Sequence, residues 1–85
     1  MKVSEDFMLR VLNGEFRGRM LPLRDSIDIG SGSDCELCLR DAAVSPSHAR
    51  LHRDGDDVVV EDLGSSLGTF LNEKPVDRAN LRTGD

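Results

Sequence analysis

Apolar side chains recur at every second position along several short stretches of this chain. Phe7, Leu9 and Val11 do so near the start, and Ala49 and Leu51 do so near the middle. A period of two places such residues on one face of a β-strand. The pattern predicts seven strands: 7–12, 20–23, 26–30, 36–39, 48–53, 58–63 and 69–71. Five strand residues are predicted to be buried: Leu37, Leu39, Ala49, Leu51 and Leu63.

Turn-forming residues separate these stretches. The turn signals stand at Asn13-Gly14, 31–34, 54–57, 72–75 and 83–85. Many short strands with turn signals every ~8–12 residues are typical of an all-β sandwich or barrel. No helical period of useful length, internal repeat or linker interrupts the pattern, so residues 1–85 are expected to form a single domain.

Composition narrows the classes of function. The chain has 85 residues, a net charge of −5, three Phe and no Trp or Tyr. Nucleic-acid binding normally requires a basic surface with aromatic stacking platforms, so a nucleic-acid partner is not expected. No apolar run approaches the ~20 residues of a membrane span, so this segment is not expected to insert directly. Two cysteines fit a reducing, cytoplasmic environment.

Several short motifs, taken in order and spacing, resemble the forkhead-associated (FHA) domain, a β-sandwich that recognises phosphothreonine. The matching segments are Leu23, Ile29-Gly30, 34–39 (DCELCL), Val44-Ser45, His48-Ala49, Asp62-Leu63, Ser65, Gly68-Thr69 and Asn72. The resemblance implies an FHA-like sandwich of two twisted antiparallel sheets, with binding loops at one end. One or two strands usually follow the turn at 83–85 in this family, which implies that the chain is a segment of a longer protein.

The resemblance also implies roles for individual loop residues. Ser45 matches a serine that donates to the phosphate, and His48 matches a histidine that braces the loops. Gly30 and Gly68 are expected to shape the loop backbone. The candidate phosphopeptide-binding residues are Ser31, Ser45, Ser47, Ser65, Ser66 and Leu67.

Three departures from the family pattern fall within these loops. Ser31 stands where the family usually has arginine, Pro46 where it has the arginine of Ser-Arg-x-His, and Leu67 where it has asparagine. A hydrogen bond to a charged group stabilises by about 1.5–3 kcal/mol, so loss of the arginine predicts phosphopeptide binding weaker by roughly 10- to 150-fold. Arg40, Arg50 and Lys74 could compensate, but each is expected to be a solvated surface charge.

Two cysteines and two histidines approach a zinc-finger spacing. Cys35 and Cys38 are followed, nine residues later, by His48 and His52. On one strand, however, the two histidines would stand about 13 Å apart, at ~3.3 Å per residue. No metal site or cofactor is therefore expected, although a metal-stabilised module stays open as an alternative that a zinc assay would reveal.

A hydrolytic triad is the second alternative. Ser45, His48 and Asp62 supply the right residue types. No nucleophile elbow or glycine-rich oxyanion loop accompanies them, so the chain is not expected to be an enzyme.

The expected function is non-catalytic protein or peptide recognition, by one of two mechanisms. The first is phosphate-independent assembly, with a weakened or lost phosphothreonine site. The opening 9–19 (LRVLNGEFRGR) and the degenerate site resemble the cytoplasmic FHA-like domain of type III secretion inner-membrane ring proteins, which implies self-association or ring assembly. The alternative is a genuine phosphothreonine-peptide reader in kinase-linked signalling.

Overall fold

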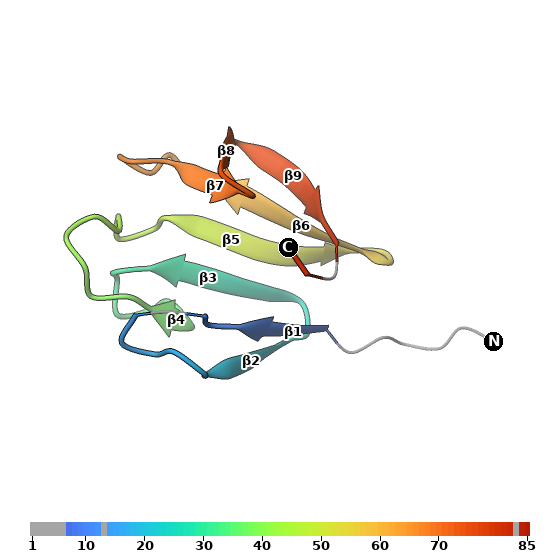
Figure 1. Cartoon of the computed structure of the whole chain (residues 1–85), viewed down its shortest axis with the longest axis horizontal. Coiled ribbons are helices and arrows are strands. Elements are labelled where there is room, and N and C mark those ends of the chain that lie inside the picture. Colours follow the sequence, from blue (N-terminus) through green and yellow to red (C-terminus); the bar gives the residue numbers. More distant parts are fainter. Residues whose placement is uncertain (1–6, 13, 83) are drawn as a thin grey trace.

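The computed structural model describes residues 7–12, 14–82 and 84–85, and every regular element in them is a β-strand (Figure 1). This confirms the all-β prediction. The strands are β1 (Phe7–Arg10), β2 (Met20–Leu23), β3 (Ser26–Gly30), β4 (Leu37–Cys38), β5 (Ala49–Asp54), β6 (Asp57–Asp62), β7 (Thr69–Leu71), β8 (Lys74–Val76) and β9 (Arg78–Leu81). None of the described residues belongs to a helix long and apolar enough to cross a membrane.

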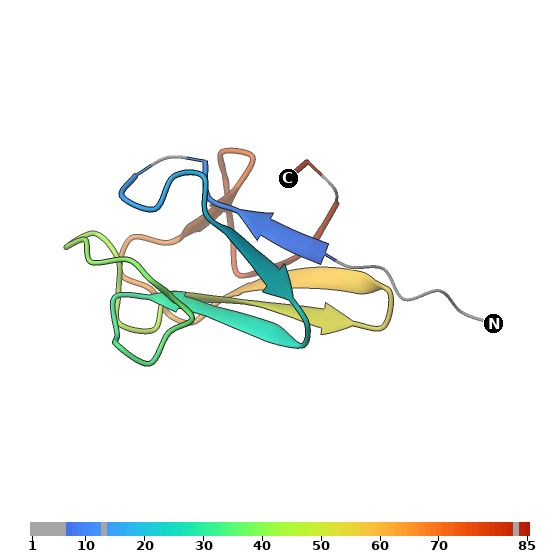
Figure 2. The ribbon, with the colours of Figure 1, turned by 90° about the horizontal axis from the view of Figure 1, so that it is seen from below.

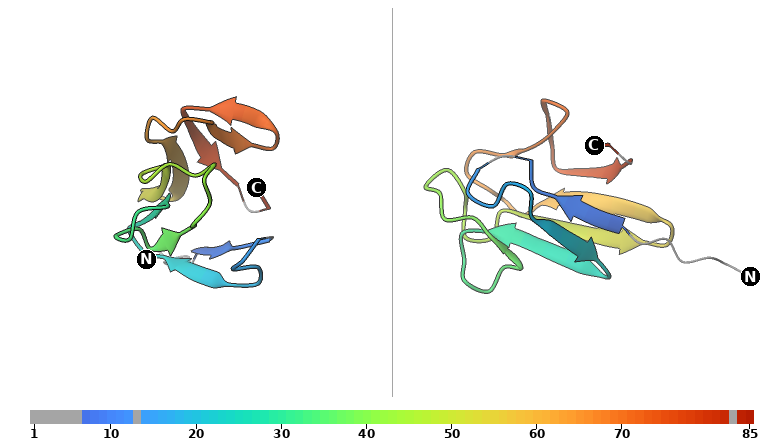
Figure 3. Two further views of the ribbon diagram at one scale, coloured as in Figure 1. Left: turned by 90° about the vertical axis from the view of Figure 1, so that its left-hand side faces the viewer. Right: turned by 60° about the horizontal axis from the view of Figure 1, so that its bottom comes forward.

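The strands form two layers. One layer is a five-stranded sheet with the order β4-β3-β5-β6-β9. The other consists of two separate ladders, β1-β2 and β7-β8, which lie on the same side of that sheet (Figures 2 and 3). The layered FHA-like arrangement is as predicted. One pair departs from the predicted antiparallel arrangement, because β3 and β4 pair in parallel.

The core lies between the two layers. Leu51 on β5 stands opposite Ile27 on β3 and Val60 on β6, so these side chains share one face of the sheet. Six buried residues form the central cluster: Leu21, Leu23, Ile27, Leu37, Leu51 and Val58. Burial was predicted correctly for Leu37, Ala49 and Leu51. It was wrong for Leu39 and Leu63, which are half-buried because β4 and β6 each end one residue earlier.

The C-terminal strands are where the strand prediction fails. Residues 72–75 were expected to form a turn, yet Asn72 and Glu73 alone make it, with φ of 50° and 70°. These positive φ values fit the two-residue turns that join adjacent antiparallel strands. Pro75 then lies within β8, which has no partner on its outer edge among the described residues, and an edge strand tolerates proline. Strand β9 was not predicted because its short run Arg-Ala-Asn-Leu has little apolar character.

Two predicted turns fall partly outside the described residues, at Asn13 and Thr83. Beyond Asn13, the loop between β1 and β2 is closed by backbone bonds between Val11 and Arg19 (2.9 Å) and between Gly18 and Val11 (2.8 Å). Val11 and Leu12 therefore belong to this loop rather than to a longer first strand.

An apolar groove of about 340 Å³ opens between β1 and the end of β9. Core side chains from both layers line it, including Leu23, Leu51 and Leu81. Part of the core is therefore accessible between the β1-β2 ladder and the end of β9.

Candidate functional site

Three loops meet at one end of the five-stranded sheet, on the left in Figure 1. They are the β3–β4 loop (31–36), the β4–β5 loop (39–48) and the β6–β7 loop (63–68). Strand β3 ends where β5 begins and where β6 ends, because β5 pairs antiparallel with both. The sheet topology therefore gathers all nine candidate residues at or beside one end of the sheet.

The β3–β4 and β4–β5 loops are in direct backbone contact. The Ser31 amide donates to the Ser45 carbonyl at 3.0 Å, and the Gly32 amide donates to the Pro46 carbonyl at 3.1 Å. A Cβ on Gly30 would overlap the Pro46 carbonyl oxygen. Glycine is therefore required at position 30 because the second loop passes directly over it.

Ser45 lies where the three loops converge. Its hydroxyl oxygen accepts a hydrogen bond from the Ser66 amide at 3.0 Å, and its own amide donates to Nδ1 of His48 at 3.2 Å. A hydroxyl has one donor and two acceptor sites. The bond from Ser66 uses an acceptor site, so the Ser45 O–H remains able to donate to a ligand.

His48 joins all three loops. Its Nδ1 accepts from the Ser45 amide, and its Nε2 lies 2.8 Å from the Gly68 carbonyl oxygen. An amide can only donate and a carbonyl can only accept, so the ring is neutral with its proton on Nε2. The His48 amide also donates to the Ile29 carbonyl at 2.9 Å, and its carbonyl accepts from Leu63 at 2.9 Å. His48 therefore connects the three loops, and its role in bracing a binding site stays a prediction from the resemblance.

Asp62 organises the β6–β7 loop, and it was not among the predicted site residues. Its carboxylate accepts from the Ser65 hydroxyl, from the Thr69 hydroxyl at 2.8 Å, and from the amides of Gly64 and Ser65 at 3.1 and 3.2 Å. The hydrogen bonds from Ser65 and Thr69 hold the pKa of the carboxyl below its usual range. Asp62 stands two residues before Gly64-Ser65, and this Asp-x-Gly-Ser pattern is a turn signal that could have identified it.

The Ser65 hydroxyl both donates and accepts a hydrogen bond within the loop. It donates to Asp62 and accepts from the Gly68 amide at 3.0 Å. Ser65 therefore tethers the loop, and a direct role in ligand binding stays a prediction. Gly68 has a φ of 90°, in the left-handed region that glycine adopts without penalty.

The remaining candidates are more open to solvent. Ser31 is half-buried, whereas Ser47, Ser66 and Leu67 are exposed. The side-chain hydroxyls of Ser31 and Ser47 make no hydrogen bond to another of the described residues. A backbone hydrogen bond joins Ser31 to Ser45, and the Ser66 amide donates to the Ser45 hydroxyl, so three hydroxyl-bearing residues are neighbours.

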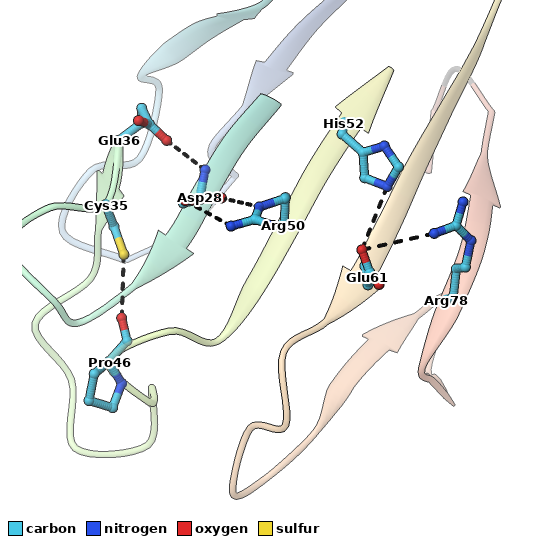
Figure 4. Close-up of polar contacts among 8 residues, drawn as sticks. All are labelled: Asp28, Cys35, Glu36, Pro46, Arg50, His52, Glu61 and Arg78. Carbon is cyan, nitrogen blue, oxygen red and sulfur yellow. Dashed lines mark hydrogen bonds and ion pairs between the residues drawn. The ribbon is translucent and has the colours of Figure 1, made fainter. Parts of the chain in front are cut away.

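The basic side chain nearest to these loops in the sheet is committed elsewhere. Arg50 Nε lies 2.6 Å from Asp28 Oδ1 on the sheet face opposite the core (Figure 4). This hydrogen bond from Arg50 holds the pKa of the Asp28 carboxyl below its usual range. On the same face, Glu61 lies 3.7 Å from His52 and 3.9 Å from Arg78. Arg50 thus belongs to a row of cross-strand charges rather than to the loops.

The two thiols bind loop carbonyls. Cys35 Sγ lies 3.3 Å from the Pro46 carbonyl oxygen (Figure 4), and Cys38 Sγ lies 3.6 Å from that of Ser31. Burial is the main cause that raises the pKa of Cys35. Among residues 7–12, 14–82 and 84–85, no three His, Cys, Asp or Glu side chains are grouped as metal ligands would be.

The hydrogen bonds of Ser45, His48 and Asp62 do not connect them as a hydrolytic triad. Both ring nitrogens of His48 face backbone groups, and the Asp62 carboxylate is bound by Ser65 and Thr69. A general base needs a free nitrogen directed at the nucleophile and a carboxylate behind it. This arrangement therefore serves loop structure.

Comparison with known proteins gives the same fold and a family. The family model described as "Inner membrane component of T3SS, cytoplasmic domain" matches residues 10–85. The glycogen accumulation regulator GarA of Mycolicibacterium smegmatis is 37% identical over 83 residues, which cover 96% of this chain and 52% of that protein. The chain spans about half the length of the curated relatives it matches first.

Solved structures agree. A domain from a structural and functional analysis of phosphothreonine-dependent FHA domain interactions has a TM-score of 0.84 and 34% identity, covering 94% of this chain and 82% of that one. The FhaA FHA domain, complexed with the intracellular domain of Rv3910, has a TM-score of 0.75 and 37% identity, covering 82% and 78%. The chain therefore belongs to the FHA domain family, in the group whose model describes the cytoplasmic domain of the type III secretion inner-membrane component.

Proposed function

We propose that this domain is a non-catalytic protein-recognition module whose affinity for its partner depends little on phosphate. The observation that carries this proposal is the composition of the loop cluster around Ser45. The cluster offers hydroxyls and backbone groups, but Ser31 occupies the position where the family usually has a phosphate-binding arginine.

The charge of the three loops supports the proposal. They contain one basic residue, Arg40, and three acidic ones, Asp34, Glu36 and Asp41. A phosphorylated threonine carries about −1.5 to −2 charges at neutral pH. Arg50 could have offset this balance, but it is paired with Asp28. The three loops therefore carry more acidic than basic side chains, which does not favour a phosphate.

The affinity for phosphate that is lost with the arginine is large enough to change the function. A hydrogen bond to a charged group contributes about 1.5–3 kcal/mol, which corresponds to roughly 10- to 150-fold in affinity. The hydroxyls of Ser45 and Ser66 can still donate to a ligand. They are neutral donors, so a phosphate gains less from them than from a guanidinium.

A genuine phosphothreonine reader is the second candidate. The observation that favours it is the intact scaffold, in which His48 braces the loops and the Ser45 O–H is available to a ligand. The related domain studied for phosphothreonine-dependent interactions adds weight to it. We place it second because that scaffold would be needed for any ligand of these loops.

The matching family model suggests where the domain acts and in what kind of assembly. The matching model describes a cytoplasmic domain of an inner-membrane secretion component, so we propose a cytoplasmic location and a role in assembly, through self-association or a ring. The FhaA domain has been crystallised with a protein domain as partner, which fits a protein rather than a small molecule as ligand.

Calorimetric titration with paired peptides tests the proposal. The peptides are selected from degenerate libraries centred on threonine or on phosphothreonine, and each is then measured in both forms. We expect affinities that agree within about threefold. A phosphorylated form bound more than tenfold tighter, a gain of about 1.4 kcal/mol, and loss of that gain in Ser45→Ala, would instead establish phosphothreonine reading.

The Ser31→Arg variant tests whether an arginine at this position restores phosphate binding. It returns a fixed positive charge to the loop beside Ser45. We expect it to bind the phosphorylated peptide at least about tenfold more tightly than the wild type does, with the unphosphorylated peptide little changed. If Ser31→Arg leaves both affinities unchanged, the identity of this residue does not limit phosphate binding.

A further inference from the structure

We propose that the outer face of the β1-β2 ladder is a second binding surface, and that its ligand is an anionic membrane. This inference goes beyond the proposed function, which concerns the loops around Ser45. The ladder face consists of five exposed side chains on β1 and β2 and directly after β2: Met8, Arg10, Met20, Pro22 and Arg24.

The register of the ladder places these side chains together. Met8 stands opposite Pro22, and Arg10 stands opposite Met20. Successive residues of a strand point to opposite faces. The residues that alternate with them pack in or against the core: Phe7, Leu9, Leu21 and Leu23. The ladder face is therefore directed away from the five-stranded sheet, and nothing among the described residues covers it (Figure 2).

Large apolar side chains are exposed on this ladder. Met8 is 49% exposed and Met20 is 52% exposed, and Leu12, in the loop that joins the two strands, is 74% exposed. They are three of the five large apolar side chains that are exposed in the described part of the chain. Removing apolar surface from water is favourable in proportion to its area, so this face favours a ligand with an apolar phase.

The positive charges of the chain are concentrated in the same segment. Residues 7–24 contain four basic residues and one acidic residue, a net charge of +3, whereas residues 25–85 contain six basic and thirteen acidic residues, a net charge of −7. Salt screens exposed charges from one another beyond roughly 8–10 Å, so a ligand at the ladder meets mainly the local positive charge. The four basic side chains are exposed, and none forms an ion pair with another described residue: Arg10, Arg17, Arg19 and Arg24.

Two of these arginines share a shallow hollow of about 390 Å³ beside β2. Arg19 and Arg24 line it together with Met20 and Pro22. A guanidinium presents a fork of donors that matches the oxygens of a phosphate. Glu36 is the only carboxylate among the residues that line the hollow, and its Oε1 accepts from the Asp28 amide at 2.7 Å. The hollow therefore suits a phosphate that carries an apolar chain.

An anionic bilayer fits this combination better than an acidic polypeptide does. Basic side chains beside exposed apolar ones are typical of surfaces that bind at the boundary between headgroups and acyl chains. An acidic polypeptide would leave Met8, Leu12 and Met20 without an apolar partner. Pro22 also lies on β2, which pairs only with β1 among the described residues, and proline on an edge strand opposes pairing with another chain.

Cosedimentation with lipid vesicles tests the proposal. The vesicles are phosphatidylcholine alone and phosphatidylcholine mixed with phosphatidylglycerol, each at low and at high salt. We expect the partition coefficient at low salt to be at least about tenfold higher with phosphatidylglycerol, and to fall as salt is added. Each basic residue near an anionic bilayer contributes about fivefold to binding, so Arg19→Gln/Arg24→Gln should lose at least about tenfold.

Two matched variants serve as controls. Arg40→Gln/Arg78→Gln makes the same change in net charge, with one residue in the β4–β5 loop and the other on β9, and it should keep the binding. Met20→Ser should weaken binding to the mixed vesicles about threefold, whereas Phe70→Ser should not, although Phe70 is 59% exposed on β7. Thermal unfolding of each variant shows that the fold is retained.

Two results would overturn the membrane assignment. One is equal binding to both kinds of vesicle, or binding that Arg19→Gln/Arg24→Gln retains. The other is binding of poly-glutamate without binding of phosphatidylglycerol vesicles, which would assign the ladder face to an acidic polypeptide. Neither result bears on the proposed function, because the vesicles carry no peptide for the loops around Ser45.

Discussion

Replacing His48 with alanine removes two hydrogen bonds that join separate loops. One comes from the Ser45 amide at 3.2 Å and the other reaches the Gly68 carbonyl at 2.8 Å. A typical intramolecular hydrogen bond contributes about 0.5–1.5 kcal/mol net, so we expect a loss of about 1–3 kcal/mol in the free energy of unfolding. For a domain of this size, 2 kcal/mol corresponds to a Tm lower by roughly 8–16 °C.

Two measurements check this prediction. Urea denaturation gives the change in the free energy of unfolding, and hydrogen exchange reports on the Ser45 amide, whose acceptor is lost. His52→Ala is the matched control: this histidine is on β5, which begins directly after His48. Its Nε2 lies 3.7 Å from Glu61 Oε1 in a half-buried surface pair, which contributes about 0–1 kcal/mol. If His48→Ala and His52→Ala are equally stable and Ser45 exchange is unchanged, the bracing argument is wrong.

Three further outcomes are expected. Gly30→Ala should destabilise by about 1–3 kcal/mol or more in urea, because its Cβ would overlap the Pro46 carbonyl oxygen; native-like stability would contradict the close approach. The pKa of the Asp62 carboxyl lies below its usual range in the folded state. The stability that this carboxylate contributes is therefore fully present above the unfolded pKa of about 3.9, and it is lost as the pH falls through the pKa of the folded state. The Tm of the wild type should therefore fall more steeply below about pH 4 than that of Asp62→Asn, and parallel curves would argue against this. Adding zinc or a chelator should leave the Tm unchanged, and stoichiometric zinc in purified protein would revive the metal-stabilised alternative.

The sequence alone was enough to predict the fold class and the place of the recognition loops. Period-two alternation is a local property, because each side chain's face depends on its own position in the strand. Strand β5 and the burial of Leu51 were therefore predictable. Strand β8 was not, since Pro75 signals a break unless its strand lies at a sheet edge, and edge position is a property of the assembled sheet.

The tertiary structure decided which candidate residues meet. Ser45 and Ser66 are 21 residues apart in sequence, and His48 and Gly68 are 20 apart, yet each pair shares a hydrogen bond. Such contacts depend on how β5 and β6 pair and on how closely the loops approach over Gly30. The engagement of Arg50 with Asp28 likewise follows from strand register. Sequence therefore determined the residues available to the site, and packing of the sheet determined their partners, because long-range contacts arise only when distant strands come together.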